Sequence, residues 1–76
     1  MTTLTKDLIS RSRVIAKGRR IRDVAKLVEN YGSQPSQWVK KSSPPFETES
    51  GVYEYHWYEC HGIGRFEIKL KKVSEP

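Results

Sequence analysis

The sequence predicts an α+β fold in which one or two N-terminal helices pack on a small antiparallel sheet. Three observations support this prediction: an amphipathic helical repeat in the first half, a proline-containing break after it, and two alternating segments around a glycine-containing turn. Two or three strands are expected, two of them forming a C-terminal hairpin. With 76 residues, the chain is expected to be a single domain.

The first helix is expected to start after Thr5, a residue type that favours the N-cap position. Leu8, Ile9 and Ile15 would form its loose apolar stripe, and Gly18 would end it. Residues 1–18 are predicted to be either a mobile segment or a separate helix, and residues 19–73 to form the core of the domain.

A stronger helix is predicted from about Arg20 to Tyr31. Apolar residues recur there at i, i+3, i+4 and i+7, as on the buried face of an amphipathic helix. These residues are Ile21, Val24, Ala25 and Val28. Gly32 is expected to end the helix in the usual C-terminal position.

The segment between the helices and the hairpin is rich in turn-forming residues. "SQPSQWV" is predicted to form a short helical turn, with Trp38 anchored in the core. "KKSSPPF" is expected to be a loop, because its double proline interrupts regular structure. Phe46 to Thr48 is predicted to add a short third strand.

Val52 to Cys60 and Arg65 to Val73 are the expected hairpin strands, joined by a loop of two or four residues within "HGIG". Both even lengths predict the same pairing. The expected pairs are Glu54 with Lys71, Tyr55 with Leu70, His56 with Lys69, Trp57 with Ile68, and Tyr58 with Glu67. Because side chains alternate between faces, two different faces result.

One expected face of the hairpin is apolar and should pack on the second helix. Its residues are Tyr53, Tyr55, Trp57, Phe66, Ile68 and Leu70. The other face is charged, and its residues are Glu54, His56, Tyr58, Arg65, Glu67, Lys69 and Lys71. That second face holds the candidate functional residues.

The charge balance favours an anionic partner. The net charge is +5, and residues 6–26 carry eight Lys or Arg side chains but only two acidic ones. The residues predicted to bind substrate are Arg19, Arg22, Lys26, Lys40, Lys41, Tyr58, Arg65 and Lys71. A solvated basic surface is the alternative interpretation.

On the charged face, His56, Lys69, Glu67 and Glu54 are the candidate catalytic residues. Metal-independent RNA cleavage needs a base for the 2′-hydroxyl, an acid for the leaving oxygen and cations for the phosphorane. His56 with Glu54 or Glu67 would supply the first two, and Lys69 with its basic neighbours the third. The alternative is a set of cross-strand ion pairs on a wet sheet face.

No cofactor and no metal is expected. His56, Cys60 and His61 lack a fourth ligand for structural zinc, and Cys60 has no clear partner that would make it a nucleophile. A single cysteine excludes an internal disulfide. With no signal peptide and no membrane-spanning run, the protein is expected in the cytoplasm, without a membrane partner.

"RRIRDVAKLVENYG", "WVKKSS" and "HWYE…G…FEIK" together resemble a small C-terminal toxin module of bacterial polymorphic toxins, of the contact-dependent and Rhs types. The resemblance covers about residues 19–71. It implies an RNase of the barnase–EndoU–colicin–RelE type, with His56 as acid or base and Lys69 as the phosphate cation. It also implies RNA as substrate and an acidic immunity or antitoxin protein as partner.

The chain begins with a Met, so we expect an intracellular toxin, a phage or plasmid product, or a degenerate binding module more than a toxin delivered between cells. The leading hypothesis is therefore a small, basic, metal-independent ribonuclease. The alternatives are a non-catalytic nucleic-acid-binding protein and a small interaction protein that binds an acidic partner.

Overall fold

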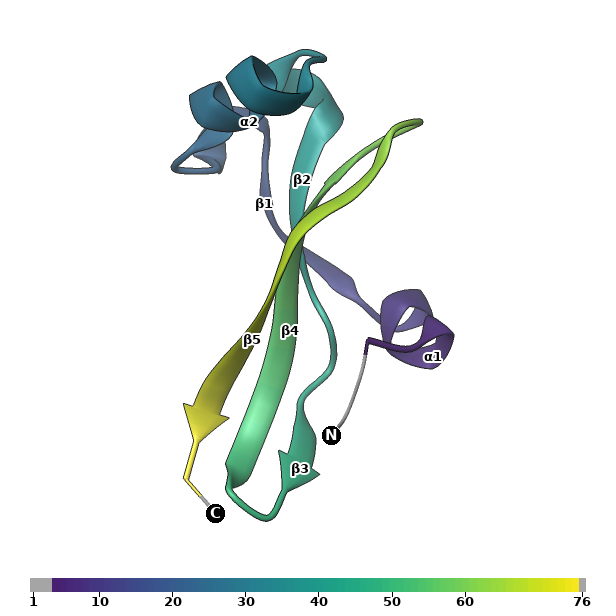
Figure 1. Cartoon of the computed structure of the whole chain (residues 1–76), viewed down its shortest axis with the longest axis vertical. Helices are drawn as coiled ribbons and strands as arrows, with labels where there is room; N and C mark the ends of the chain where they lie inside the picture. Colours follow the sequence, from purple (N-terminus) through teal and green to yellow (C-terminus); the bar gives the residue numbers. More distant parts are fainter. Residues whose placement is uncertain (1–3, 76) are drawn as a thin grey trace.

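The computed structural model describes residues 4–75 and shows a five-stranded antiparallel sheet with two short α-helices (Figure 1). In chain order the elements are α1 (Lys6–Ser10), β1 (Arg13–Lys17), the 3-10 turn η1 (Gly18–Arg20), α2 (Val24–Tyr31), the 3-10 turn η2 (Pro35–Gln37), β2 (Trp38–Ser42), β3 (Phe46–Thr48), β4 (Gly51–Cys60) and β5 (Gly64–Ser74). The α+β class and the antiparallel sheet are confirmed, but the sheet has more strands than the two or three predicted.

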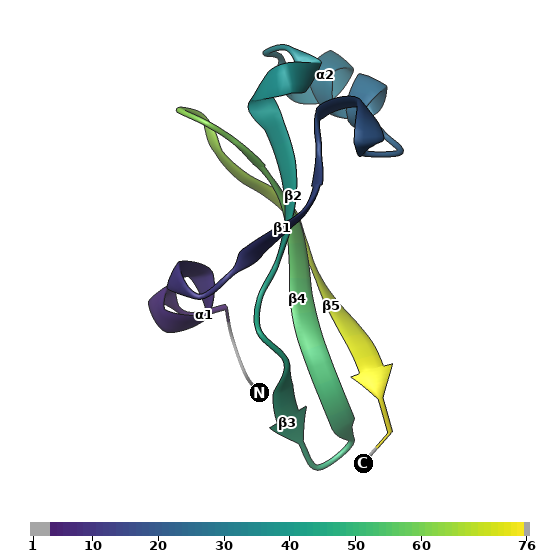
Figure 2. The same ribbon diagram turned by 180° about the vertical axis from the view of Figure 1, so that it is seen from behind.

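Strand β4 is the centre of the sheet. β5 pairs along one of its edges, and β2 and β3 pair with opposite ends of the other edge, while β1 extends the sheet beyond β2. Both ribbon views show β4 and β5 running together along the molecule, with α2 near one end (Figures 1 and 2). The predicted third strand, Phe46–Thr48, is confirmed as β3.

The first helix is much shorter than predicted, because it ends at Ser10 and not near Gly18. Its start is as expected: the Leu8 N–H donates to the Thr5 hydroxyl at 3.2 Å. The following segment, Arg13–Lys17, is a strand that pairs with β2. It contains adjacent β-branched residues, which favour extended backbone, and pairing with β2 satisfies its peptide groups.

The second helix begins at Val24, four residues later than predicted. Gly18–Arg20 instead forms η1, and Ile21 has extended backbone at φ −73° and ψ 121°. The predicted end is confirmed: Gly32 has φ +93°, and its N–H closes the last turn. Glycine suits this position because it has no Cβ to oppose a positive φ.

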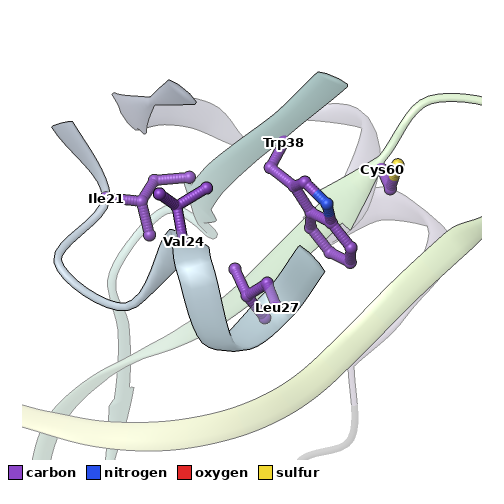
Figure 3. Packing of buried hydrophobic residues seen from close by; sticks show 5 residues of the cluster. All are labelled: Ile21, Val24, Leu27, Trp38 and Cys60. Atoms are coloured by element: carbon purple, nitrogen blue, oxygen red, sulfur yellow. The ribbon is translucent and has the colours of Figure 1, made fainter. Parts of the chain in front are cut away.

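The main core lies between α2 and one face of the sheet (Figure 3). Its buried residues are Ile21, Val24, Leu27, Trp38 and Cys60. The predicted anchor, Trp38, is fully buried, and its indole N–H donates to the Gly32 carbonyl at 3.2 Å. Phe66 joins this core, with its ring 5.5 Å from that of Trp38.

A second core covers the opposite face, where Leu8 of α1 packs with Tyr55 and Trp57. The prediction that the Tyr55–Trp57 face packs on α2 is therefore wrong. Two other members of the predicted apolar face, Ile68 and Leu70, are about half exposed, at 50% and 49%. The apolar residues of β4 are divided between two faces, so the protein has two small cores.

The hairpin loop has three residues, because Cys60 pairs with Gly64. The prediction of an even loop is wrong, and near the turn the register is shifted by one: Tyr58 pairs with Phe66, not with Glu67. A β-bulge then restores the predicted register, so that His56 pairs with Lys69 as expected. The shift moves Phe66 onto the face of Trp38 and α2.

Candidate nucleic-acid interface

A groove of about 620 Å³ lies between the segment that leads into α2 and one face of the sheet. Five cationic side chains line it: Arg20, Arg22, Lys40, Lys69 and Lys71. Tyr58 is its aromatic residue and Asp23 its acidic one. We call this the basic groove. It combines cations from η1 and the segment after it with cations from β2 and β5.

A smaller hollow of about 80 Å³ adjoins the basic groove. The two share four lining residues, which are Lys40, Tyr58, Lys69 and Lys71. His56, Trp57 and Glu67 complete the lining. We call this the inner hollow. It brings together three of the four candidate catalytic residues, His56, Lys69 and Glu67.

Strand register explains why these side chains converge. Lys40 of β2 is opposite Tyr58 of β4, and Lys69 of β5 is opposite His56. Opposed residues in an antiparallel pair face the same side, as do residues two apart on one strand. The three strands therefore place Lys40, Tyr58, His56 and Lys69 on one face, beside the part of that face covered by α2.

The cations of the basic groove have no ion pair among residues 4–75. The ion pairs of the same residues use other cations: Arg11 with Asp7, Arg13 and His56 with Glu54, Lys41 with Glu59, and Lys72 with Glu75. Within the groove, Lys40 instead lies over the Tyr58 ring, with Nζ 5.8 Å from the centroid. Burial, and then Asp23 and Glu67, raise the pKa of Tyr58, so its hydroxyl stays neutral at pH 7.

His56 is held by Glu54, whose Oε1 lies 3.0 Å from His56 Nε2. Ser42 Oγ is 3.1 Å from the same carboxylate oxygen, and Arg13 is 3.9 Å from Oε2. The hydrogen bond with His56 lowers the pKa of Glu54, and Ser42 and Arg13 lower it further, against the opposing effect of burial. His56 Nδ1 is buried and has no hydrogen-bond partner within residues 4–75. Glu54 thus positions the ring from outside the inner hollow.

Glu67 has an unusual backbone conformation, with φ +53° at the β-bulge. Glu67 is one of the residues that line the inner hollow. Its Oε2 lies 3.3 Å from the hydroxyl of Tyr31, which does not line the hollow. Tyr31 in turn stacks on Phe66 with ring centroids 4.3 Å apart. Burial and the Glu67 carboxylate together raise the pKa of Tyr31, so its hydroxyl remains protonated and donates to Glu67.

Four predicted substrate-binding residues do not line the basic groove or the inner hollow: Arg19, Lys26, Lys41 and Arg65. Lys41 lies on the other face of β2, where it pairs with Glu59 at 3.2 Å. Burial raises the pKa of Glu59, but hydrogen bonds from Trp57 and Lys41 outweigh this effect, and the net shift is downward. Glu59 is thus part of a structural pair.

Arg20 lines the basic groove but was not among the predicted binding residues. The helix was predicted to start at about Arg20, and Arg19, Arg22 and Lys26 were the residues near it that were predicted to bind substrate. In the structure the helix starts after these arginines, so helical spacing does not describe their directions. The run "RRIR" was the available signal, since it places arginines on both sides of the buried Ile21.

Comparisons of the chain with protein families, with curated proteins and with solved structures found no match. Within residues 4–75, no three His, Cys, Asp or Glu side chains are placed to hold a metal ion together. No helix in the same range is long and apolar enough to cross a membrane.

Proposed function

We propose that the protein binds RNA, with the phosphates of one strand lying along the basic groove. One observation carries this proposal. Five cations from three separate parts of the chain line one groove, and none has a carboxylate partner among the described residues. Gathering unpaired like charges costs free energy, which phosphate groups of a ligand would offset.

The composition of the groove suits a single strand of nucleic acid. Cations track a phosphate backbone, and an aromatic ring among them offers a surface for a base. Tyr58 is such a ring, and it lines both the basic groove and the inner hollow. A shallow, open groove of this size is also what a domain of 76 residues can build without a deep pocket.

The proposal is tested by measuring the affinity for a fluorescent single-stranded RNA over a range of salt concentrations. Each phosphate contact contributes about −0.7 to the slope of log affinity against log salt for a single strand. Lys69→Ala with Lys71→Ala should reduce the magnitude of this slope by about 1.4 and weaken binding roughly tenfold at low salt.

Lys6→Ala with Arg11→Ala is the matched control. It removes the same charge from α1 and its C-cap residue Arg11, and α1 packs on the opposite face of the sheet. Binding through the groove predicts a small, non-specific loss for this control. Equal losses in both double variants would refute the groove as the binding site, and the absence of any RNA binding would refute the function.

RNA cleavage in the inner hollow is a second candidate function. The Glu54–His56 pair favours it, because a carboxylate that orients an imidazole is a common arrangement for proton transfer. The Glu67 carboxylate would take the 2′-hydroxyl proton as the 2′-oxygen attacks phosphorus. The leaving 5′-oxygen would accept a proton from the His56 imidazolium, and Lys69 would stabilise the extra charge of the phosphorane.

We favour RNA binding over RNA cleavage as the function, because neither ring nitrogen of His56 is free to contact a substrate. Nε2 contacts Glu54, and Nδ1 is buried. Cleavage therefore requires the imidazole to turn when RNA binds. If the protein cleaves RNA, it would act as a toxin. An acidic immunity or antitoxin protein would then neutralise it by covering the basic groove.

Cleavage is tested by incubating the purified protein with total RNA and tRNA in the presence of EDTA. Active protein should degrade RNA, and His56→Ala should abolish degradation while leaving the fold intact, as judged by circular dichroism. His61→Ala, in the exposed hairpin loop, is the matched control and should leave degradation unchanged. Intact RNA with wild-type protein would exclude cleavage by the protein alone.

A further inference from the structure

The row of cations along the basic groove ends at the inner hollow. Neighbouring strands follow one another across the sheet in the order β1, β2, β4 and β5. The groove begins on the β1 side with Arg20 and Arg22, and it passes Lys40 of β2 to reach Lys69 and Lys71 of β5. These three lysines also line the inner hollow. The hollow therefore lies at the β5 end of the row.

Among the described residues that line the hollow, no further lysine or arginine continues the row. The residues that line the hollow but not the groove are His56, Trp57 and Glu67. His56 Nε2 lies 3.0 Å from the Glu54 carboxylate, and Trp57 is buried in the second core. Glu67 is acidic, and its Oε2 contacts the Tyr31 hydroxyl outside the hollow. A phosphate placed beyond the hollow would meet this carboxylate instead of a cation.

The hollow and the groove differ in size. The hollow has a volume of about 80 Å³ and the groove about 620 Å³, and the two share four lining residues. The bases and riboses of a strand need the larger space, whereas a phosphate group is compact. An internal phosphate has a nucleotide on both sides, so the strand must enter and leave its site. A terminal phosphate needs only the side that is shared with the groove.

The charge of the hollow also favours a terminal phosphate. Lys40 from β2 and Lys69 and Lys71 from β5 have no carboxylate partner within residues 4–75. An internal phosphate carries one negative charge and two unesterified oxygens. A phosphomonoester carries a charge of about −1.5 to −2 at pH 7 and three such oxygens. Charge-assisted hydrogen bonds to these oxygens are among the strong ones in proteins, so three lysines match a phosphomonoester best.

We propose that the inner hollow binds the terminal phosphate of an RNA strand, so that the protein recognises phosphorylated RNA ends. Lys40, Lys69 and Lys71 donate to the three terminal oxygens. The nucleotides that follow lie along the basic groove toward Arg20 and Arg22. This inference rests on the proposed RNA-binding function and names its substrate class, which is a single strand with a phosphomonoester at its 5′ or 3′ end.

The test compares, by isothermal titration calorimetry at one salt concentration, uridine pentamers with a phosphate at the 5′ end, at the 3′ end or at neither end. A uridine hexamer with hydroxyl ends has as many phosphate groups as a phosphorylated pentamer, and it controls for the added phosphate. At least one phosphorylated pentamer should bind about tenfold more tightly than both hydroxyl-ended strands, which is the scale of one hydrogen bond to a charged group. The end that gives the gain identifies the direction of the strand in the groove.

Lys69→Ala should reduce this advantage to about twofold or less, because it removes one of the three donors. Lys72→Ala is the matched control and should keep the advantage, since Lys72 is on the same strand, pairs with Glu75 at 2.9 Å and lines neither the groove nor the hollow. Circular dichroism checks that both variants are folded.

Phosphorylated pentamers that bind no better than the hydroxyl-ended hexamer would overturn the inference while leaving RNA binding in place. An advantage that survives Lys69→Ala would overturn it as well. Failure of all four oligonucleotides to bind would instead refute the proposed function, and the inference with it.

Discussion

His56 Nε2 lies 3.0 Å from Glu54 Oε1, and the two residues are two positions apart on β4. Side chains at this spacing share a face, so the strand itself brings the pair together. The lysines of the inner hollow come from the neighbouring strands, Lys40 from β2 and Lys69 from β5. The pair and the cations therefore depend on the correct register of three strands.

Removing the charge of Glu54 should destabilise the protein in a pH-dependent way. The pKa of Glu54 is lowered in the folded protein, chiefly by the hydrogen bond with His56. Its carboxylate therefore stabilises the fold above the unfolded pKa of about 4.3, and this contribution disappears as the pH falls through the lower folded value. Glu54→Gln should cost about 1 kcal/mol at pH 7.

Urea denaturation of wild type and Glu54→Gln at pH 7, 5 and 3 measures this dependence. The difference in free energy of unfolding should shrink below about pH 4, as the wild-type carboxyl group becomes protonated. Glu47→Gln, on the exposed strand β3, is the control for a change in overall charge. A difference for Glu54→Gln that stays constant from pH 7 to pH 3 would contradict a stabilising role of the ionised Glu54 carboxylate.

Replacing Glu67 by residues of different backbone preference should reveal the strain at the bulge. Glycine adopts positive φ freely and asparagine adopts it more readily than most residues, whereas valine is strongly disfavoured there. Glu67→Gly and Glu67→Asn should be about as stable as wild type, and Glu67→Val should lose more than about 1 kcal/mol. Thermal denaturation would contradict a strained position if valine were tolerated as well as asparagine.

Gly51 should be far less tolerant of a side chain than Gly62, although both have positive φ, at +146° and +82°. A Cβ at Gly51 would lie 2.6 Å from the Ser74 carbonyl oxygen, whereas a Cβ at Gly62 would meet no atom within 4 Å. Gly51→Ala should therefore reduce the free energy of unfolding by about 1–2 kcal/mol more than Gly62→Ala. Chemical denaturation of the two variants measures the difference, and equal costs would contradict the close contact of β4 with β5.

Trp38 should be the most sensitive core position. It is fully buried, contacts α2, and donates a hydrogen bond to the Gly32 carbonyl. Trp38→Phe keeps an aromatic ring but loses volume and the indole donor, so it should cost about 2–3 kcal/mol. Trp57→Phe probes the second core, and urea denaturation compares the two. A stable, fully folded Trp38→Phe protein with unchanged midpoint would contradict this packing.

Local patterns in the sequence predicted the features that depend on neighbouring residues. The periodicity of Ile21, Val24 and Val28 identified the second helix, and Gly32 marked its end correctly. The pairing of His56 with Lys69 was also predicted, because alternation is strong in both strands. This pairing also predicted that His56, Lys69 and Glu67 would lie close together, and all three line the inner hollow.

Features that depend on distant pairing could not be predicted. Arg13–Lys17 resembles a helical continuation, and only pairing with β2 makes it a strand. The three-residue loop shifts the pairing of β4 with β5 by one residue, and the bulge at Glu67 reverses this shift. Beyond the bulge the pairing is the one that an even loop would give, so the alternation of apolar and polar residues could not reveal the odd loop. Between the loop and the bulge the shift moves Phe66 to the other face, where it packs against the core beneath α2.

NMR titration of ¹⁵N-labelled protein with a single-stranded RNA shows whether RNA binds in the basic groove. The largest amide shift changes should occur around residues that line the groove: Arg20, Arg22, Lys40, Tyr58, Lys69 and Lys71. Amides of α1 and β3, away from the groove, should change little. Changes centred on α1 or β3, or no changes at a large excess of RNA, would contradict RNA binding in the basic groove.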